Sequence, residues 1–224
     1  LVRANIQYQG RNLAVMKDTS SGTATYKIES VDSETEPIVF DYSESSALRS
    51  THGQEESSST TISFVKQGNN LSILSTVKDS TRDNDGTQTQ SYSPPLLYYS
   101  GDAAQGKSWE VGVMRDRDTR SLISAKGSGR ETVTVPAGTF KDCLKVVYTS
   151  DDISGTVEIF NKEFTLTSGR SRGVYWIAEG VGVVKELEVF TSTAEAPGPE
   201  GGVIIVNAAS CSVNELKPGF IISK

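Results

Sequence analysis

The sequence predicts a mainly β protein, and three observations support that prediction. Short runs in which polar and apolar residues alternate recur along almost the whole chain, which is the pattern of half-buried strands. Clusters of glycine, serine, asparagine and aspartate separate these runs, as expected for the short turns of an antiparallel meander. No stretch combines a helical period with capping residues. The strand pattern by itself allows either one antiparallel sheet or a two-sheet β-sandwich.

The expected elements follow the alternating runs in chain order. Two polar stretches, 41–59 and 78–95, are expected to be exposed loops because serine, threonine and charged residues dominate them. Turns are expected at 9–12, 20–22, 67–70, 152–155 and 168–173. Strands are expected at 2–8, 23–31, 37–42, 60–66, 71–78, 109–115, 131–135, 142–149, 156–166, 173–178, 183–190 and 202–207.

Domain boundaries follow from the distribution of strands and turn residues. Residues 1–191 are expected to form one antiparallel β domain. The segment 192–202, "STAEAPGPEGG", is rich in proline and glycine and is expected to be a linker-like break. Residues 203–224 are expected to supply a final strand and a tail that packs back on the domain.

A tight corner is expected where Pro136 interrupts an alternating run. Residues 132–135 alternate polar and apolar, and proline cannot donate to a sheet ladder, so the strand must end or lie on an edge there. Val135-Pro136-Ala137-Gly138 fits a type I turn with Pro136 at its second position. Gly138 is therefore expected to have a positive φ as the next strand begins.

The strand after this corner is expected to have an apolar and a wetter face. Phe140, Leu144, Val146 and Tyr148 share one parity, whereas Lys141, Cys143, Lys145 and Val147 share the other. Two later strands carry apolar sets of their own, Val174 with Trp176 and Val183 with Leu187 and Val189. Same-face residues of antiparallel neighbours lie in register, so these sets are expected to form one continuous apolar surface.

Tryptophan, glycine and cysteine add further expectations. Trp109 and Trp176 are either core anchors or the lining of a groove, and the sequence allows both. Gly180 and Gly182 are expected to form a hairpin corner. Cys143 and Cys211 are the only cysteines. They are expected either to form a disulfide, if the protein is exported, or to be buried free thiols.

Charge and hydropathy exclude several classes of partner. The net charge of −6 comes from acidic and basic residues that are mixed along the chain, and no basic stripe indicates a nucleic-acid surface. No segment approaches the ~20 apolar residues that cross a bilayer. The chain begins directly with a strand-like run, as expected for an exported protein whose leader lies outside this sequence.

Three short motifs resemble chemical sites but lack the context that such sites need. The segment 169–173, "GRSRG", matches a nucleophile elbow, yet a strand-like run follows it and the only histidine, His52, lies upstream. The acids Asp83 and Asp85 suggest a calcium loop, but its first and last ligand positions hold unsuitable residues. The "DRD" at 116–118 has further arginines beside it and is expected to be solvated. One histidine and two cysteines cannot form the usual zinc site. The sequence therefore predicts no catalytic residue, cofactor or metal, and no enzyme.

Three longer segments resemble a family of bacterial envelope proteins. "PPLLYYSGDAAQGKSWE", "ETVTVPAGTFKDCLKVVY" and "GVYWIAEGVGVVKEL" are similar to segments of uncharacterised TapB-like lipoproteins with a domain of unknown function, over about residues 92–190. The family often has proline where this chain has Glu179, so the turn before Gly180 departs from its pattern. The resemblance implies a single strongly curved antiparallel sheet, a half-barrel similar to the LolA-like lipoprotein-carrier fold. It also implies a periplasmic or surface-anchored location.

Two functions follow from this resemblance. The first is a carrier that holds a lipid or other hydrophobic ligand in the concavity of the sheet. The second is a structural or assembly protein that contacts other envelope proteins. A continuous apolar concavity would favour the carrier, whereas a filled core with an open, uncharged edge strand would favour assembly. The ligand-binding residues expected for the carrier are Phe140, Leu144, Val146, Tyr148, Val174, Trp176 and Leu187.

Overall fold

Antiparallel strands account for most of the chain. The computed structural model describes residues 1–31, 37–51, 53, 55–80, 87–116, 118–159 and 162–218, and confirms the prediction of a mainly β fold. The strands are divided between two sheets, and the chain between two units: Leu1–Lys17 with Asp102–Lys224, and Asp18–Gly101. Residues 18–101 thus form a compact unit of their own. In the described part of the chain, no helix has the length and apolar character needed to cross a membrane.

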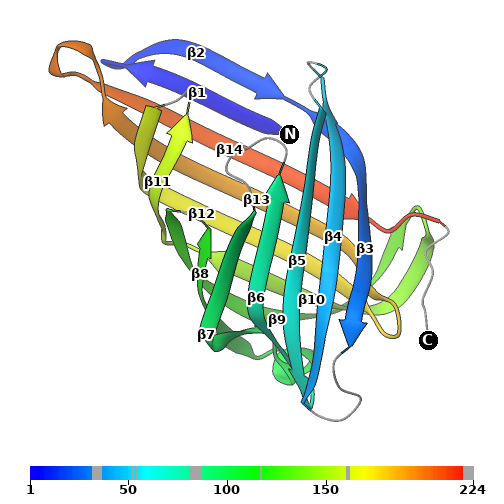
Figure 1. The fold of residues 1–224 in the computed structure, drawn as a ribbon. Helices are drawn as coiled ribbons and strands as arrows, with labels where there is room; N and C mark the ends of the chain where they lie inside the picture. The colour runs from blue at the N-terminus through cyan, green and yellow to red at the C-terminus, as the bar shows by residue number, and fades with distance from the viewer. Residues whose placement is uncertain are drawn as a thin grey trace. The chain divides into compact units, whose positions relative to one another are not determined.

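The larger sheet has nine strands and is partly curled (Figure 1). In spatial order, β8 pairs with β9, and the path then continues through β12, β13, β14 and β1 to β2. Both β10 and β11 lie between β9 and β12, because each of them pairs with both of these longer strands. The strands are β1 (Val2–Tyr8), β2 (Arg11–Asp18), β8 (Ser108–Asp116), β9 (Thr119–Val135), β10 (Gly138–Ser150), β11 (Ile153–Ile159), β12 (Lys162–Ala178), β13 (Gly182–Pro197) and β14 (Val203–Glu215). Two short 3-10 segments, Gly101–Gln105 and Pro199–Gly201, precede β8 and β14.

The smaller sheet is a five-stranded meander in which each strand pairs with the next one in the sequence. Its core is formed by Phe64, Ile73 and Leu96, all of which are buried. The rings of Phe40, Tyr42 and Tyr98 surround Phe64 with centroid distances of 5.5 to 6.3 Å. The strands are β3 (Ser20–Val31), β4 (Ile38–Ser50), β5 (Glu55–Gln67), β6 (Asn70–Ser80) and β7 (Gln88–Tyr99).

Two apolar clusters stabilise the larger sheet. Each brings together residues that are distant in the sequence, so the clusters fix the pairing of the hairpins as well as burying apolar area. One consists of Val133, Val135, Cys143, Ala178 and Val184. The other consists of Phe164, Leu166, Ala194, Ala196 and Val206.

Several expected loops and turns are strands instead. Most of 41–59 belongs to β4 and β5, and 88–95 belongs to β7. Backbone ladder bonds do not require apolar side chains, and the hydroxyls of Ser46 and Ser58 pair across the strands at 2.8 Å. The polar composition of these segments therefore led to a wrong prediction of loops. A polar segment can continue a strand whose register is set by apolar residues elsewhere on the same strand.

Segments rich in small residues were also predicted wrongly, two of them as turns and one as a linker. Residues 20–22 lie in β3 and 168–173 in β12. A Cβ on Gly22 would lie 1.8 Å from the carbonyl oxygen of Ala47, so this glycine permits close strand contact rather than a turn. The expected linker begins with the end of β13, where Ala194 and Ala196 are buried in the second cluster. The expected strand 156–166 is the end of β11 and the start of β12, on either side of residues outside the described part.

The two expected hairpin corners have the backbone geometry that their sequences require. Gly138 has φ +137° and pairs with Val135 across the two-residue loop Pro136–Ala137. Gly180 and Gly182 have φ +72° and +100° in the turn between β12 and β13. Both corners lie at hairpin ends of the larger sheet.

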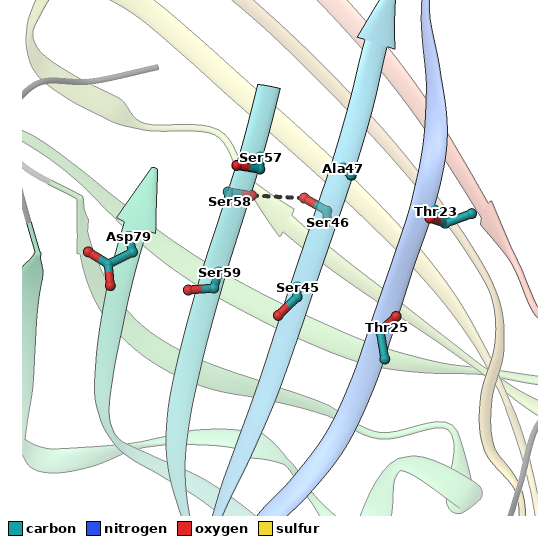
Figure 2. A pocket seen from close by; sticks show the side chains of 9 residues that line it. All are labelled: Thr23, Thr25, Ser45, Ser46, Ala47, Ser57, Ser58, Ser59 and Asp79. Carbon is teal, nitrogen blue, oxygen red and sulfur yellow. Dashed lines mark hydrogen bonds between the residues drawn. The ribbon is translucent and has the colours of Figure 1, made fainter. Parts of the chain in front are cut away.

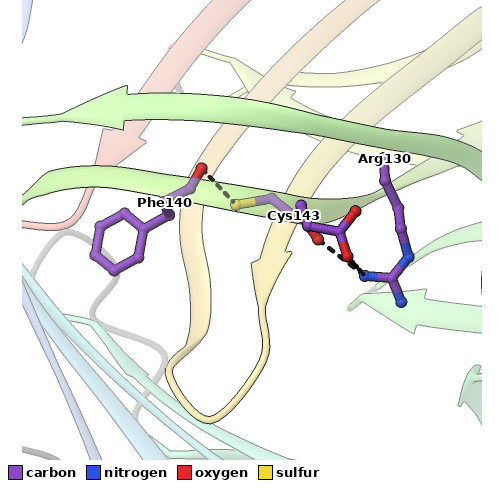
Figure 3. A network of polar contacts seen from close by, with 4 residues as sticks. Arg130, Phe140 and Cys143 are labelled. Atoms are coloured by element: carbon purple, nitrogen blue, oxygen red, sulfur yellow. Dashed lines mark hydrogen bonds and ion pairs between the residues drawn. The ribbon is translucent and has the colours of Figure 1, made fainter.

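A bulge in β10 changes which side chains share a face. The register with β9 shifts between Phe140 and Cys143, and Asp142 between them has φ +58°. Arg130 holds this bulge by donating to the Asp142 carbonyl oxygen at 2.8 Å and to its carboxylate at 3.1 Å (Figure 3). Phe140 consequently packs against the cluster that contains Cys143. The expectation that Phe140 shares a face with Leu144 is therefore wrong.

Candidate functional site

The register of β10 and β12 assigns the expected ligand-binding residues to opposite faces of the larger sheet. Leu144, Val146 and Tyr148 pair with Ile177, Tyr175 and Gly173, whereas Lys145 and Val147 pair with Trp176 and Val174. Paired residues of antiparallel strands project to the same side. Val174 and Trp176 therefore lie on the face opposite Leu144, Val146 and Tyr148, and Leu187, which pairs with Val174, lies with them. The expected continuous apolar surface does not form. We name the two sides the Tyr148 face and the Trp176 face.

Charged residues surround Trp176 on the Trp176 face. The Trp176 ring lies between two ammonium groups, with Lys145 Nζ 5.2 Å and Lys185 Nζ 5.9 Å from its centroid. Its indole N–H donates to Glu131, which also accepts from Lys145 at 3.2 Å. These two hydrogen bonds, that of Trp176 first, lower the pKa of the Glu131 carboxyl. Lys185 pairs with Glu215 at 2.7 Å. Together these contacts link β9, β10, β12, β13 and β14, which indicates a structural role for Trp176.

A row of aromatic rings crosses the Tyr148 face. The Trp109 and Tyr148 centroids are 6.3 Å apart with the rings at 85°, and those of Tyr148 and Tyr175 are 5.1 Å apart at 78°. A Cβ on Gly173 would lie 2.8 Å from the Tyr175 ring, so the absence of a side chain there gives the ring its place. Tyr148 is buried, whereas Trp109 and Tyr175 are half-buried and so keep part of their apolar surface exposed.

Two glutamates lie at the end of this row. Glu186 pairs in register with Tyr175 and Asn214, and Glu188 with Gly173. The Tyr175 hydroxyl donates to Glu188 Oε1 at 2.8 Å, and Asn214 Nδ2 donates to Glu186 Oε2 at 3.3 Å. Trp109, Tyr148, Tyr175, Glu186 and Glu188 together are called the tyrosine–glutamate site below.

The two carboxyl groups influence each other. Burial first, and then the charge of Glu188, raise the pKa of Glu186 to about 7, although hydrogen bonding by Tyr175 and Asn214 opposes the rise. Glu186 is half-buried and Glu188 is exposed. Among the residues that the structure describes, neither carboxylate makes an ion pair with lysine or arginine. The described part of the site therefore has a negative charge without an ion-pair partner and a second carboxyl that titrates near neutral pH.

This arrangement is suited to binding and to proton exchange. Exposed ring surface offers apolar contact and attracts cations, and the carboxylates accept hydrogen bonds. Metal binding has no comparable support, because the described residues hold no group of three or more His, Cys, Asp or Glu side chains placed to hold an ion. Tyr175, Glu186 and Glu188 were not among the site residues predicted from the sequence. The signal was present, since Glu186 and Glu188 alternate with Leu187 and Val189 and thus oppose the apolar face of β13.

The short chemical motifs of the sequence do not form sites. The "GRSRG" segment lies within β12, where Gly169 and Gly173 are buried, so it forms no elbow. Asp116 and Asp118 lie at the connection of β8 to β9, where the Asp118 carbonyl oxygen accepts from the Thr156 amide. Asp83, Asp85 and His52 lie outside the described residues.

The expected disulfide between Cys143 and Cys211 is wrong, and both thiols are free. Cys143 lies in β10 and Cys211 in β14, with β12 and β13 between them. Three steps of about 4.8 Å separate these two strands by about 14 Å. Cys211 is also in register with Thr149, six residues along β10 from Cys143, whereas a disulfide requires Cα atoms within about 7 Å. The buried Cys143 thiol donates to the Phe140 carbonyl oxygen at 3.4 Å (Figure 3), and burial raises its pKa. Of the expected buried free thiols, both are free, but only Cys143 is fully buried and Cys211 is partly exposed.

A shallow hollow lies on the smaller sheet (Figure 2). Its volume is about 640 Å³, and small hydroxyl side chains with one carboxylate line it. No aromatic ring and no cation belongs to the lining, so it offers neither a ring for stacking nor charge complementarity to an acid. The lining residues are Thr23, Thr25, Ser45, Ser46, Ala47, Ser57, Ser58, Ser59 and Asp79.

Comparison with known proteins gives one match. Residues 101–191 match the family model described as DUF3108-like, which is a family of unknown function. The match supports a relation to a family with a domain of unknown function, and it covers all five residues of the tyrosine–glutamate site. No curated protein and no solved structure matches the chain.

Proposed function

We propose that the nine-stranded sheet is a non-enzymatic binding module that holds a lipid or other hydrophobic small molecule against the Tyr148 face. The observation that carries this proposal is the row of Trp109, Tyr148 and Tyr175, which ends at two carboxyl groups. Sites for small molecules combine apolar and aromatic contact with a few polar groups that fix orientation. The Trp176 face is the weaker candidate because paired charges cover it.

The cellular setting is part of the same proposal. The resemblance of about residues 92–190 to envelope lipoproteins supports a periplasmic or surface-anchored location. The partly curled sheet is compatible with a LolA-like carrier (Figure 1). The ligand contacts differ from those expected from the sequence, since Leu144, Val146 and Val174 are buried in the sheet. Trp109 and Tyr175, which are half-buried, take their place as the proposed contacts.

The two tryptophans allow a direct test. Trp109 lies on the Tyr148 face and Trp176 on the opposite face, so each variant with one tryptophan reports on one side. Trp176→Phe leaves Trp109, and we expect its fluorescence to change saturably when decyl maltoside is added below its micelle concentration. Trp109→Phe leaves Trp176, whose emission should not change. A response from Trp176 alone, or from neither, would contradict the proposed site.

An edge strand favours a second function, the assembly of envelope proteins. β2 is the last strand on its side of the larger sheet, and no described strand pairs with its outer edge. Leu13, Val15 and Met16 are 62%, 57% and 47% exposed, and residues 12–16 carry no charge. Such an edge can accept a strand from another chain. If it does, the molar mass from light scattering should rise with concentration, and Val15→Lys should abolish the rise. A monomer at every concentration would exclude self-association through β2.

A further inference from the structure

The charge balance of the tyrosine–glutamate site indicates the chemistry of its ligand, provided that the proposed function holds. Among the described residues, the titratable groups that face Glu186 are Glu188 on its own strand and Tyr175 on β12. From β14 it faces the uncharged Asn214. These neighbours supply hydrogen bonds and negative charge but no positive charge. A ligand that brings a cation would provide what the protein lacks.

A second observation at the same face points to a ligand with another polar atom. Ser150 is 2% exposed, and its Oγ has no hydrogen-bond partner among the described residues. It follows Tyr148 by two residues in β10 and pairs with Ser171, so it projects to the Tyr148 face about 7 Å further along the strand. A buried hydroxyl without a partner is costly, and a polar group of a ligand would satisfy it.

We infer that the Tyr148 face binds an organic cation, an amine or quaternary ammonium attached to an apolar group. The positive charge lies against Glu186, Glu188 and the Tyr175 ring, and the apolar part covers Trp109. Aromatic faces and carboxylates together are the groups that recognise ammonium ligands. A polar atom of the ligand bonds to Ser150.

Protonation regulates this binding. The Glu186 pKa of about 7 means that the site gains its second negative charge only as the pH rises through neutrality. A cation should therefore bind more tightly above about pH 7 than below it, whereas a neutral ligand of the same length should not respond.

Three probes with the same tail separate the cation inference from the proposed function. Decyltrimethylammonium, decyl maltoside and decanoate are added below their micelle concentrations at about pH 5.5 and about pH 8.5, on either side of the Glu186 pKa. The readout is the fluorescence of Trp109 in the Trp176→Phe protein. The cationic probe should bind at least about tenfold more tightly at the higher pH, as for a charge-assisted contact. Glu186→Gln should remove this dependence. The control is Glu163→Gln, an exposed site on β12, and it should leave the dependence unchanged.

The outcomes are distinguishable. Similar affinities for the three probes, with no effect of Glu186→Gln, would overturn the cation inference and leave the proposed binding face intact. Preference for decanoate would also overturn it. If no probe changes the Trp109 signal, both the inference and the proposed function are wrong.

Discussion

Replacing Glu186 by glutamine should stabilise the protein at alkaline pH. The half-buried Glu186 carboxyl lies between Tyr175, Asn214 and Glu188. Glutamine keeps the size of the side chain and an oxygen that can accept from Asn214, but it cannot ionise. The variant therefore imitates the protonated carboxyl at every pH, and the difference from the wild type isolates the effect of ionisation.

The size and sign of this effect follow from the pKa. The rise from 4.5 to about 7 corresponds to about 3 kcal/mol, at about 1.4 kcal/mol for each pKa unit. Between these values the folded chain holds a proton that the unfolded chain has released, so wild-type stability decreases as the pH rises. This contribution is fully present below about pH 4.5, and it is lost as the pH passes through about 7.

Urea denaturation across this pH range is the assay. The unfolding free energy of Glu186→Gln minus that of the wild type should increase by about 3 kcal/mol between about pH 4.5 and about pH 8. Glu163→Gln, at an exposed site, should show a nearly constant difference. A constant difference for Glu186→Gln as well would refute the reasoning, because it would mean that Glu186 titrates as an ordinary carboxyl.

Three other predictions concern the framework of the larger sheet. Gly138→Val should lower the unfolding free energy by about 1–3 kcal/mol. The cause is the φ of +137° alone, since no atom lies within 4 Å of the position that a Cβ would take. An unchanged denaturation midpoint would reject the assigned turn. Gly127→Ala should cost at least about 2 kcal/mol, because its Cβ would lie 1.7 Å from the Ala103 carbonyl oxygen; a melting temperature equal to that of the wild type would contradict this packing. Thiol titration of the denatured, unreduced protein should find both cysteines free, and in the native protein Cys143 should react more slowly than the less buried Cys211. Equal native rates would be evidence against the burial of Cys143.

Alternation in the sequence was sufficient to predict the fold class and most strands. It succeeded where apolar residues alternate, as in β1, whose bounds Val2–Tyr8 match the predicted 2–8. It failed for the serine-rich parts of β4 and β5, because their sheet is held in register by apolar residues elsewhere on the same strands. Glycines in β12 were mistaken for a turn, although they give room to neighbouring side chains.

The site was harder to predict because it depends on register across strands. The bulge at Asp142 separates Phe140 from Leu144, and the pairing of Lys145 with Trp176 puts that tryptophan on the other face. Neither feature follows from the parity of one strand. The alternation of Glu186 and Glu188 was visible in the sequence, but their contact with Tyr175 requires β12 and β13 to be paired in the observed register. Local pattern predicts faces within a strand, whereas a site needs the alignment of several strands.

The two indole N–H signals in a proton–nitrogen NMR spectrum of the wild-type protein test the central claim most directly. The chain has two tryptophans, and they lie on opposite faces of the larger sheet. On titration with decyltrimethylammonium at about pH 8.5, above the Glu186 pKa, the Trp109 signal should shift and saturate while the Trp176 signal, held by Glu131, stays in place. A shift of Trp176 with Trp109 unmoved, or no shift of either signal, would contradict binding at the tyrosine–glutamate site.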